Sequence, residues 1–394
     1  MDKPQPFLLR RLLPAALLFV VWTGCQSGEA VDRTTESREP AELQDVTPCP
    51  ECAAELIDRL GLREDPTPVR ERPDWSPPRV VVVFGNETLI ARLQAAAPGV
   101  EVVDISEPDA WTRYMHEADG VIGECSPKVV NDAPKLKWIQ IGSAGAERCV
   151  SVPGIKERGI LLTNAQRLYG PEIAEHVIAM MFAFSRGLYR YIPAQQERSW
   201  KRGLIPRSQH WELEGRTLLV VGLGGIGTEV AWRADALGMR VVATRRSSRE
   251  GPEFVEYVGT ADEVVELARQ ADVVVNTAPL TPETTGMFDA EFFAAMKPTA
   301  YFISVGRGKS VVTDDLVAAL ESGDIAGAGL DVTDPEPLPS GHPLWRLPNV
   351  IITPHISGMS DAAGERLWTL MEENLRRFVA GERMLSVVDV ERGY

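Results

Sequence analysis

Three charged or titratable side chains follow apolar runs in the second half of the chain. Arg307 lies in SVGRG, Glu336 in DVTDPEP and His355 in TPHIS. If the apolar runs are strands of one parallel sheet, these side chains meet at its carboxyl edge, where α/β proteins bind ligands. A guanidinium binds carboxylate oxygens through its planar fork, and an imidazole moves protons near neutral pH. Each residue alone is also common as a solvated or structural group, so their shared edge is what makes them candidates.

Residues 218–248 have the pattern of a strand, a glycine turn, a helix and a second strand, which predicts the unit around which such a sheet is built. Leu218–Val221 and Arg240–Thr244 are strand patterns, and between them GLGGIG opens a helical run that ends at Gly238. The first glycine of this spacing makes the turn, the second lets the backbone approach a pyrophosphate, and the third lets the helix pack against the strand. We favour a dinucleotide site over an ordinary glycine-rich turn. The residues that would bind the dinucleotide at the helix N-terminus are Gly222, Gly224, Gly225, Ile226 and Gly227.

The end of the second predicted strand indicates which dinucleotide binds. NAD-specific sites place a carboxylate about 20 residues past the glycines, where it binds the ribose 2′-hydroxyl. Here that position reads ATRRSS, with Arg245 and Arg246 in place of a carboxylate. Two guanidiniums beside serines suit a 2′-phosphate, because they offer it charge-assisted hydrogen bonds. We therefore predict a preference for NADP(H), with NAD(H) as the alternative if the arginine pair is only solvated.

Alternating strand and helix patterns predict two doubly wound parallel sheets of the Rossmann type with a cleft between them. Strands of the first sheet are expected at 80–84, 100–104, 120–123, 138–142 and 160–163, and those of the second at 218–221, 240–244, 273–276, 301–304, 326–331 and 350–353. Pro171 opens a long helix, Glu172 to about Arg186, that crosses between the lobes, and an amphipathic helix from about Asp361 to Ala380 returns to the first lobe. We place a substrate-binding domain at 79–186 plus 359–394 and a dinucleotide-binding domain at 187–358.

These motifs and several others together resemble the D-isomer-specific 2-hydroxyacid dehydrogenases, the family of glyoxylate/hydroxypyruvate reductases and D-3-phosphoglycerate dehydrogenases. The resemblance covers roughly residues 80–390 and rests on GLGGIG, SVGRG, GSAGAE, AEHVIAMM, APLTPETTGMF, GLDVTDPEP and ITPHISG. It implies that Arg307, Glu336 and His355 form the catalytic set. It also implies that the substrate is bound by Ser143, Ala144 and Gly145 together with Arg307. The further cofactor-lining residues that it implies are Ala278, Thr284, Val305, Gly306 and Asp331.

The resemblance implies hydride transfer between a nicotinamide and a small D-2-hydroxy acid or its 2-oxo acid, such as glyoxylate or hydroxypyruvate. His355 would protonate the carbonyl oxygen, Glu336 would orient the imidazole and favour its charged form, and Arg307 would fix the substrate. Glu336 argues against formate, because formate dehydrogenases of this superfamily pair the histidine with glutamine. Glu147 stands where the family usually has aspartate, which leaves the shape of that loop open. A dinucleotide-sensing binding protein without turnover is the alternative, although the complete catalytic set weighs against it.

Residues 1–25 predict an export signal. Lys3, Arg10 and Arg11 precede an apolar run from Leu12 to Trp22, which suits a signal-peptide core and is too short to span a bilayer comfortably. The following TGC resembles the processing site of bacterial lipoproteins, with Cys25 as the lipidated residue, although Trp22 departs from that site. We expect export to the bacterial cell envelope and a lipid anchor there. A cytoplasmic enzyme behind a misassigned start codon is the alternative.

Composition and cysteine spacing indicate where a linker lies and which metal sites, disulfides and partners are expected. Residues 26–78 are polar and proline-rich, which predicts a disordered linker with one short helix from Cys52 to Leu60. The five cysteines are too few for a disulfide framework, and only Cys49 and Cys52 are spaced like metal ligands, so we expect no metal. These two could form a redox pair or half of a metal site, but we favour two linker cysteines that can form a disulfide after export. The net charge of −15 argues against nucleic acid as a partner. The resemblance implies a homodimer, with the partner at the helix from Glu172.

Overall fold

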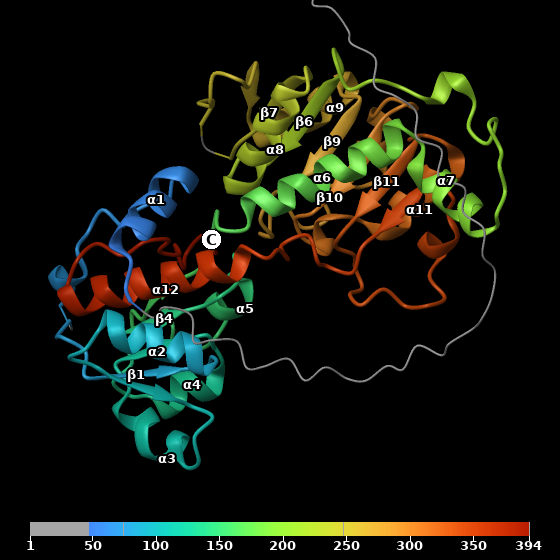
Figure 1. The fold of residues 1–394 in the computed structure, drawn as a ribbon. Coiled ribbons are helices and arrows are strands. Elements are labelled where there is room, and N and C mark those ends of the chain that lie inside the picture. Colours follow the sequence, from blue (N-terminus) through green and yellow to red (C-terminus); the bar gives the residue numbers. More distant parts are fainter. Residues whose placement is uncertain (1–46, 74, 247, 394) are drawn as a thin grey trace, which may run out of the picture. The chain divides into compact units, whose positions relative to one another are not determined.

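The computed structural model describes residues 47–73, 75–246 and 248–393, and Cys25 lies outside them with the rest of the expected export signal. Two parallel sheets organise the described residues (Figure 1). The first has the order β2-β1-β3-β4-β5 and consists of β1 (Val80–Val83), β2 (Glu101–Asp104), β3 (Gly120–Ile122), β4 (Trp138–Gln140) and β5 (Leu161–Thr163). The second has the order β12-β11-β10-β9-β6-β7-β8 and consists of β6 (Thr217–Val221), β7 (Arg240–Thr244), β8 (Tyr257–Gly259), β9 (Val273–Asn276), β10 (Tyr301–Ser304), β11 (Gly327–Leu330) and β12 (Val350–Ile352). The expected fold class, two doubly wound α/β lobes, is confirmed.

Helices cover both faces of each sheet. Those of the first lobe are α2 (Glu87–Ala96), α3 (Ala110–Tyr114), α4 (Pro127–Asp132), α5 (Glu147–Val150) and α12 (Ala363–Ala380), joined by α1 (Pro50–Leu60). Those of the second lobe are α6 (Gly170–Ser185), α7 (Leu188–Gln196), α8 (Gly225–Ala236), α9 (Val264–Gln270), α10 (Ala290–Ala295) and α11 (Thr313–Ser322). Short 3-10 helices lie at Val69–Glu71, Met115–Glu117, Arg207–Gln209, Ala261–Glu263, Gly308–Ser310 and Pro343–Arg346.

The C-terminal helix α12 completes the first lobe. Leu375 and Phe378 of this helix lie in one buried cluster with Val81 and Trp138 of the sheet, and the Phe378 and Trp138 rings are 4.9 Å apart. The buried Asn374 side chain donates to Gln140 Oε1 at 2.8 Å, which ties α12 to β4. A helix that follows the last strand of the second sheet therefore returns to the first, as its amphipathic pattern predicts.

Helix α6 belongs to the core of the second lobe, which corrects the predicted boundary at residue 186. Val177 and Met181 lie in one buried cluster with Val220 of β6 and Ile303 of β10, and α6 packs against α8. The helix has buried residues along most of its length. Its sequence pattern therefore predicts that it is buried, but it does not predict against which sheet the helix packs. The chain thus leaves the first lobe before α6 rather than after it.

The expected disordered linker is wrong for the described part of residues 47–78. Helix α1 ends at a left-handed Gly61, as expected, but Leu56 and Leu60 are buried in a cluster with Leu168, Leu370 and other apolar residues. In Figure 1, α1 lies beside α12, and the two helices contact each other. More than 100 residues separate α1 from each of these partners, so composition alone does not predict the contact.

Two disulfides occur within the described residues, and the one between Cys125 and Cys149 is not predicted from the sequence. Cys49 and Cys52 are bonded at the start of α1, and the Cys49 Sγ also accepts a hydrogen bond from the Cys52 amide. Cys125 and Cys149 are bonded in the first lobe, 24 residues apart in the chain. No group of metal-ligating side chains and no helix with the length and apolar character of a membrane span is found in the described part of the chain.

Candidate functional site

The glycine turn between β6 and α8 lies where the strand order of the second sheet reverses. Strand β6 pairs with β7 on one side and β9 on the other, and ligands of such sheets bind in the crevice at this point. Gly222 has φ of 99°, and a Cβ there would lie 2.8 Å from the Ala278 Cα. A Cβ at Gly224, by contrast, would meet no atom within 4 Å. The turn thus needs glycine for its own geometry at Gly222 and is open at Gly224, which fits the approach of a pyrophosphate.

Two arginines lie at the end of β7, and one of them contacts the glycine turn. The Arg245 Nε donates to the Leu223 carbonyl at 2.9 Å, which holds this guanidinium against the glycine turn, and Arg246 is exposed beside it. No carboxylate follows β7 before Glu250 in the sequence. The donor set at this strand end therefore suits a phosphate better than a ribose hydroxyl.

Arg307 follows β10 and contacts the loop expected to bind the substrate. Its Nε donates to Glu147 Oε1 at 2.5 Å and its Nη1 to the Gly306 carbonyl at 2.9 Å. The contact with the loop is close, because a Cβ at Gly145 would collide with the Arg307 guanidinium. Structure therefore brings Arg307 to the predicted segment Ser143–Gly145, where Ser143 Oγ donates to the Gly145 carbonyl at 2.7 Å. The pairing of Arg307 with Glu147 is not predicted, although the sequence marks Glu147 as unusual.

His355 and Glu336 form the second polar pair. The His355 Nδ1 and Glu336 Oε1 atoms are 2.7 Å apart, and their side chains are 47% and 43% exposed. This separation is that of a hydrogen bond between an imidazole and a carboxylate, which fixes the ring orientation and leaves Nε2 for proton transfer. The pair expected from the sequence is thus formed, in a place that solvent and small molecules reach.

Asp331 orders the loop that carries His355. Its buried carboxylate accepts hydrogen bonds from the Ile356 amide at 2.9 Å, the Ser357 amide at 3.1 Å and the Thr353 hydroxyl at 2.7 Å. Burial by itself would raise the pKa of Asp331, but the hydrogen bonds from Ser357, Thr353 and Ile356 hold it below its usual value. The carboxylate is therefore ionised and committed to the loop, so its main contacts support His355.

A pocket of about 170 Å³ joins the glycine turn to the substrate loop. The predicted site residues that line it are Ala144, Gly145, Gly224, Gly225, Ile226, Ala278, Val305, Gly306 and Arg307. Thr284 lies elsewhere, and its hydroxyl donates to the Pro279 carbonyl at 2.7 Å. Neither His355 nor Glu336 lines this pocket, so the candidate residues form two groups: the pocket with Arg307, and the His355–Glu336 pair.

Arg167 is a pocket residue that the sequence does not predict. It lies between β5 and α6, lines the same pocket as Gly224 and Gly225, and has φ of 70°. Left-handed backbone is uncommon for a residue with a side chain, and such residues concentrate at functional sites. No motif or spacing in the sequence distinguishes Arg167 from other solvated arginines.

Comparisons with known proteins agree with the two-lobed fold. Residues 178–357 match the family model described as the NAD binding domain of D-isomer specific 2-hydroxyacid dehydrogenase. The human glyoxylate reductase/hydroxypyruvate reductase is 35% identical over an alignment of 327 residues, and the alignment covers 79% of this chain and 98% of the relative. A glyoxylate reductase of Pyrococcus furiosus is 34% identical, and its alignment covers 67% of this chain and 79% of the relative. The structure of an NADPH-dependent glyoxylate/hydroxypyruvate reductase from Sinorhizobium meliloti, in complex with NADP and sulfate, superposes with a TM-score of 0.69 at 29% identity and covers 81% of this chain and 100% of that one.

Proposed function

Because the chain belongs to the D-isomer-specific 2-hydroxyacid dehydrogenase family, we propose that it transfers a hydride between NADP(H) and a small D-2-hydroxy acid or its 2-oxo acid. The observation that carries this proposal is the 2.7 Å contact between His355 Nδ1 and Glu336 Oε1 in the dinucleotide lobe. It supplies an oriented proton donor, which reduction of a carbonyl requires. Relatives named glyoxylate reductase support a short substrate of the glyoxylate or hydroxypyruvate kind.

The side chains divide the reaction between them. A bound reduced nicotinamide would supply the hydride. Arg307 would bind the substrate carboxylate through its guanidinium, for which it must exchange Glu147 for the substrate. His355 would donate a proton from Nε2 to the carbonyl oxygen, and Glu336 would hold the imidazole and stabilise its positive charge.

Turnover with short 2-oxo acids tests the reaction. We expect loss of absorbance at the nicotinamide band when glyoxylate or hydroxypyruvate is added to enzyme and NADPH. In the His355→Gln variant, kcat should fall by about 10²- to 10⁴-fold, the usual contribution of a positioned acid, while the Kd of NADPH stays unchanged. Tight NADPH binding without turnover of any short 2-oxo acid would contradict the proposal and favour a dinucleotide-sensing protein.

The preference for NADP(H) over NAD(H) is supported by Arg245 at the end of β7 and by Arg246 beside it. A hydrogen bond between charged groups contributes about 1.5–3 kcal/mol, so replacing both arginines by alanine should lower kcat/KM for NADPH by at least about 10-fold. The value for NADH should change little, because NADH has no 2′-phosphate. A wild-type enzyme that prefers NADH would refute this assignment.

A lipid anchor at Cys25 is a separate proposal about location, supported only by the sequence of residues 1–25. We expect the wild-type protein to incorporate a metabolic lipid label and to fractionate with membranes. The Cys25→Ala variant should lose both properties. A soluble, unlabelled wild type would exclude the anchor.

The homodimer expected at the helix from Glu172, α6, stays a proposal, and we extend its interface to α7, which follows α6 in the chain. Leu188 and Ile192 of α7 are 45% and 53% exposed, and Trp200 beyond the helix is 95% exposed. Exposed apolar side chains that gather on one segment are typical of an interface between chains. Light scattering should give twice the mass of one chain for the wild type and a lower mass for Ile192→Asp, and a monomeric wild type would rule the dimer out.

A further inference from the structure

We propose that Arg63 and Arg167 bind the pyrophosphate of the dinucleotide, so that the N-terminal segment, residues 47–73, forms part of the cofactor site. The proposal rests on the proposed function, because it requires a dinucleotide at the glycine turn. Three features support it. Arg167 packs against Gly225, the first residue of α8, and the N-terminal segment docks beside Arg167. Positive charges also cluster around Arg167.

Arg167 lies against the start of the helix that receives the pyrophosphate. A Cβ at Gly225 would come within 2.6 Å of the Arg167 Cγ and 2.8 Å of its Cα. Gly225 is the first residue of α8, and the N-terminus of such a helix attracts phosphate through free N–H groups and a positive dipole end. Arg167 therefore adds a guanidinium at the place where the helix already favours an anion.

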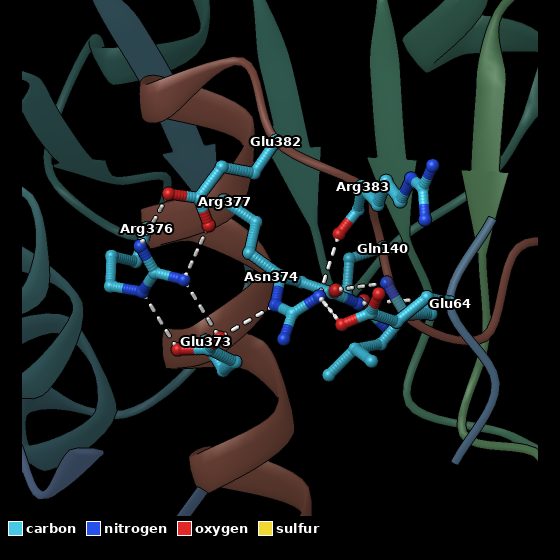
Figure 2. A network of polar contacts seen from close by, with 9 residues as sticks. Glu64, Gln140, Glu373, Asn374, Arg376, Arg377, Glu382 and Arg383 are labelled. Atoms are coloured by element: carbon cyan, nitrogen blue, oxygen red, sulfur yellow. Dashed lines mark hydrogen bonds and ion pairs between the residues drawn. The ribbon is translucent and has the colours of Figure 1, made fainter. Parts of the chain in front are cut away.

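The N-terminal segment is fixed to Arg167 and to the C-terminal residues. The Arg167 Nη1 donates to the Leu60 carbonyl at 3.3 Å, at the end of α1. Three residues further on, the Arg63 carbonyl accepts from the Ser386 amide at 2.9 Å. Figure 2 shows the next link, in which Arg377 of α12 binds Glu64 Oε1 at 2.7 Å. The backbone of Arg63 is thus held three residues after the carbonyl that Arg167 contacts, and its side chain is exposed.

Three arginines from distant parts of the chain share this region. Burial lowers the pKa of Arg167, and the positive charges of Arg63 and Arg245 lower it further. Glu229 acts in the opposite direction, but its carboxylate is paired with Arg233 at 2.5 Å. The side chains of Arg167 and Arg245 donate hydrogen bonds to backbone carbonyls. Among the described residues, no carboxylate forms an ion pair with Arg63, Arg167 or Arg245. A pyrophosphate, with two negative charges, would relieve the repulsion between Arg63 and Arg167, while Arg245 is left for the 2′-phosphate.

Binding of NADPH and of NADH to the full chain, measured by calorimetry, tests the proposal without turnover. Arg167→Ala should weaken both dinucleotides by about 10-fold or more, the effect of a lost hydrogen bond between charged groups. Arg63→Ala should weaken both by about 2- to 5-fold, as expected for an exposed ion pair, and Arg63→Glu should weaken both further. Arg59→Ala, which removes a positive charge from the same segment, should leave both affinities unchanged and serves as the control.

The pattern across the two dinucleotides distinguishes the possible failures. Wild-type affinity in both Arg63→Ala and Arg167→Ala would overturn the inference while leaving the proposed function intact. A loss confined to NADPH would overturn the pyrophosphate assignment and point to the 2′-phosphate. A wild-type chain that binds neither dinucleotide would refute the proposed function and this inference with it. Arg167→Lys keeps the charge, so an unchanged thermal midpoint with intermediate affinity in this variant would separate a charge effect from misfolding.

Discussion

His355 holds a left-handed backbone conformation, with φ of 54°. Its amide donates to the Asp331 carbonyl at 2.8 Å, and the Asp331 carboxylate accepts the amides of the next two residues, Ile356 and Ser357. Asp331 thus constrains the backbone on both sides of the imidazole, since Thr353 also donates to it. The family resemblance suggests that Asp331 contacts the cofactor, and the structure adds a positioning role through His355.

Substitution of Asp331 by asparagine tests this positioning role. The amide would turn a donor toward amides that need an acceptor, so we expect a lower kcat with an unchanged Kd for NADPH. The variant should also lose about 1.5–3 kcal/mol of unfolding free energy at pH 7, the contribution of hydrogen bonds to a charged group. Because folding lowers the pKa of Asp331, its contribution to stability is present above the unfolded-state pKa and is lost as the pH falls through the folded-state pKa. The difference in unfolding free energy between wild type and variant, measured with denaturant, should therefore be larger at pH 7 than at acid pH.

Glu147 occupies Arg307, which is proposed to bind the substrate. Its carboxylate engages the Arg307 Nε, the group expected to bind a 2-oxo acid, and both side chains are about one-third exposed (30% and 32%). An ion pair of this exposure contributes about 0.2–1 kcal/mol, so Glu147→Gln should lower KM for the 2-oxo acid by about 1.5- to 5-fold and leave kcat nearly unchanged. Steady-state kinetics at saturating NADPH measures both constants. A higher KM in the variant would mean that Glu147 orients Arg307 rather than occupying it.

Strands of the two sheets are predictable from the sequence because both faces of a parallel sheet are covered. The buried runs Val273–Asn276 and Tyr301–Ser304 are observed with the predicted bounds. The strand Tyr257–Gly259 is missed because it is a three-residue edge strand that begins with an exposed residue, so it has no continuous apolar run. Helix α7 is missed as well, since it contains Pro193 and only Ala194 is buried.

Contacts between distant segments are the part of the site that the sequence does not predict. Arg307, Glu336 and His355 follow predicted strands, so the carboxyl-edge rule finds them. Arg167 becomes a pocket residue only because α6 packs on the second sheet. Glu147 pairs with Arg307 only because the two lobes meet there. Both contacts depend on tertiary packing, which local pattern and propensity do not encode.

The disulfide between Cys125 and Cys149 stabilises the short helix that carries Glu147. Cys149 lies in α5, two residues after Glu147, and Cys125 lies in the loop after β3. A bond that closes a loop of about this length contributes about 2–4 kcal/mol to stability. We expect the Cys125→Ala/Cys149→Ala variant to unfold at lower denaturant concentration by that amount. It should also show a higher KM for the 2-oxo acid, because the Ser143–Glu147 loop would be less ordered.

The exposed disulfide provides the control for that experiment. Cys49 and Cys52 close a loop of only a few residues, so Cys49→Ala/Cys52→Ala should change stability much less. The KM of the 2-oxo acid should stay at the wild-type value in this second variant. Equal losses of stability in both variants would show that the Cys125–Cys149 bond has no special role in the substrate loop.

At the scale of the whole molecule, the two ends of the described chain are joined. The residues after α1 run along those after α12, with the Asp65 amide donating to the Met384 carbonyl at 2.8 Å and the Val69 amide to the Glu382 carbonyl at 2.9 Å. Below this pairing, Leu56 and Leu60 fill a cluster with Leu370 and Leu385. The segment is therefore an integral part of the first lobe, although its composition is that of a linker.

This integration predicts a measurable loss of stability when α1 is weakened. Leu60 is 5% exposed, and removing most of a buried leucine side chain costs about 2–5 kcal/mol. Leu60→Ala should therefore lower the free energy of unfolding by an amount in that range, whereas Glu55→Ala, at an exposed position of the same helix, should change it by less than about 0.5 kcal/mol. A tether that only rests on the lobe would instead unfold separately, so Leu60→Ala would leave the main denaturant transition at the wild-type midpoint. If the segment also presents Arg63 to the dinucleotide, added NADPH should raise the midpoint of Leu60→Ala less than that of the wild type, because part of the binding site is then lost with the segment.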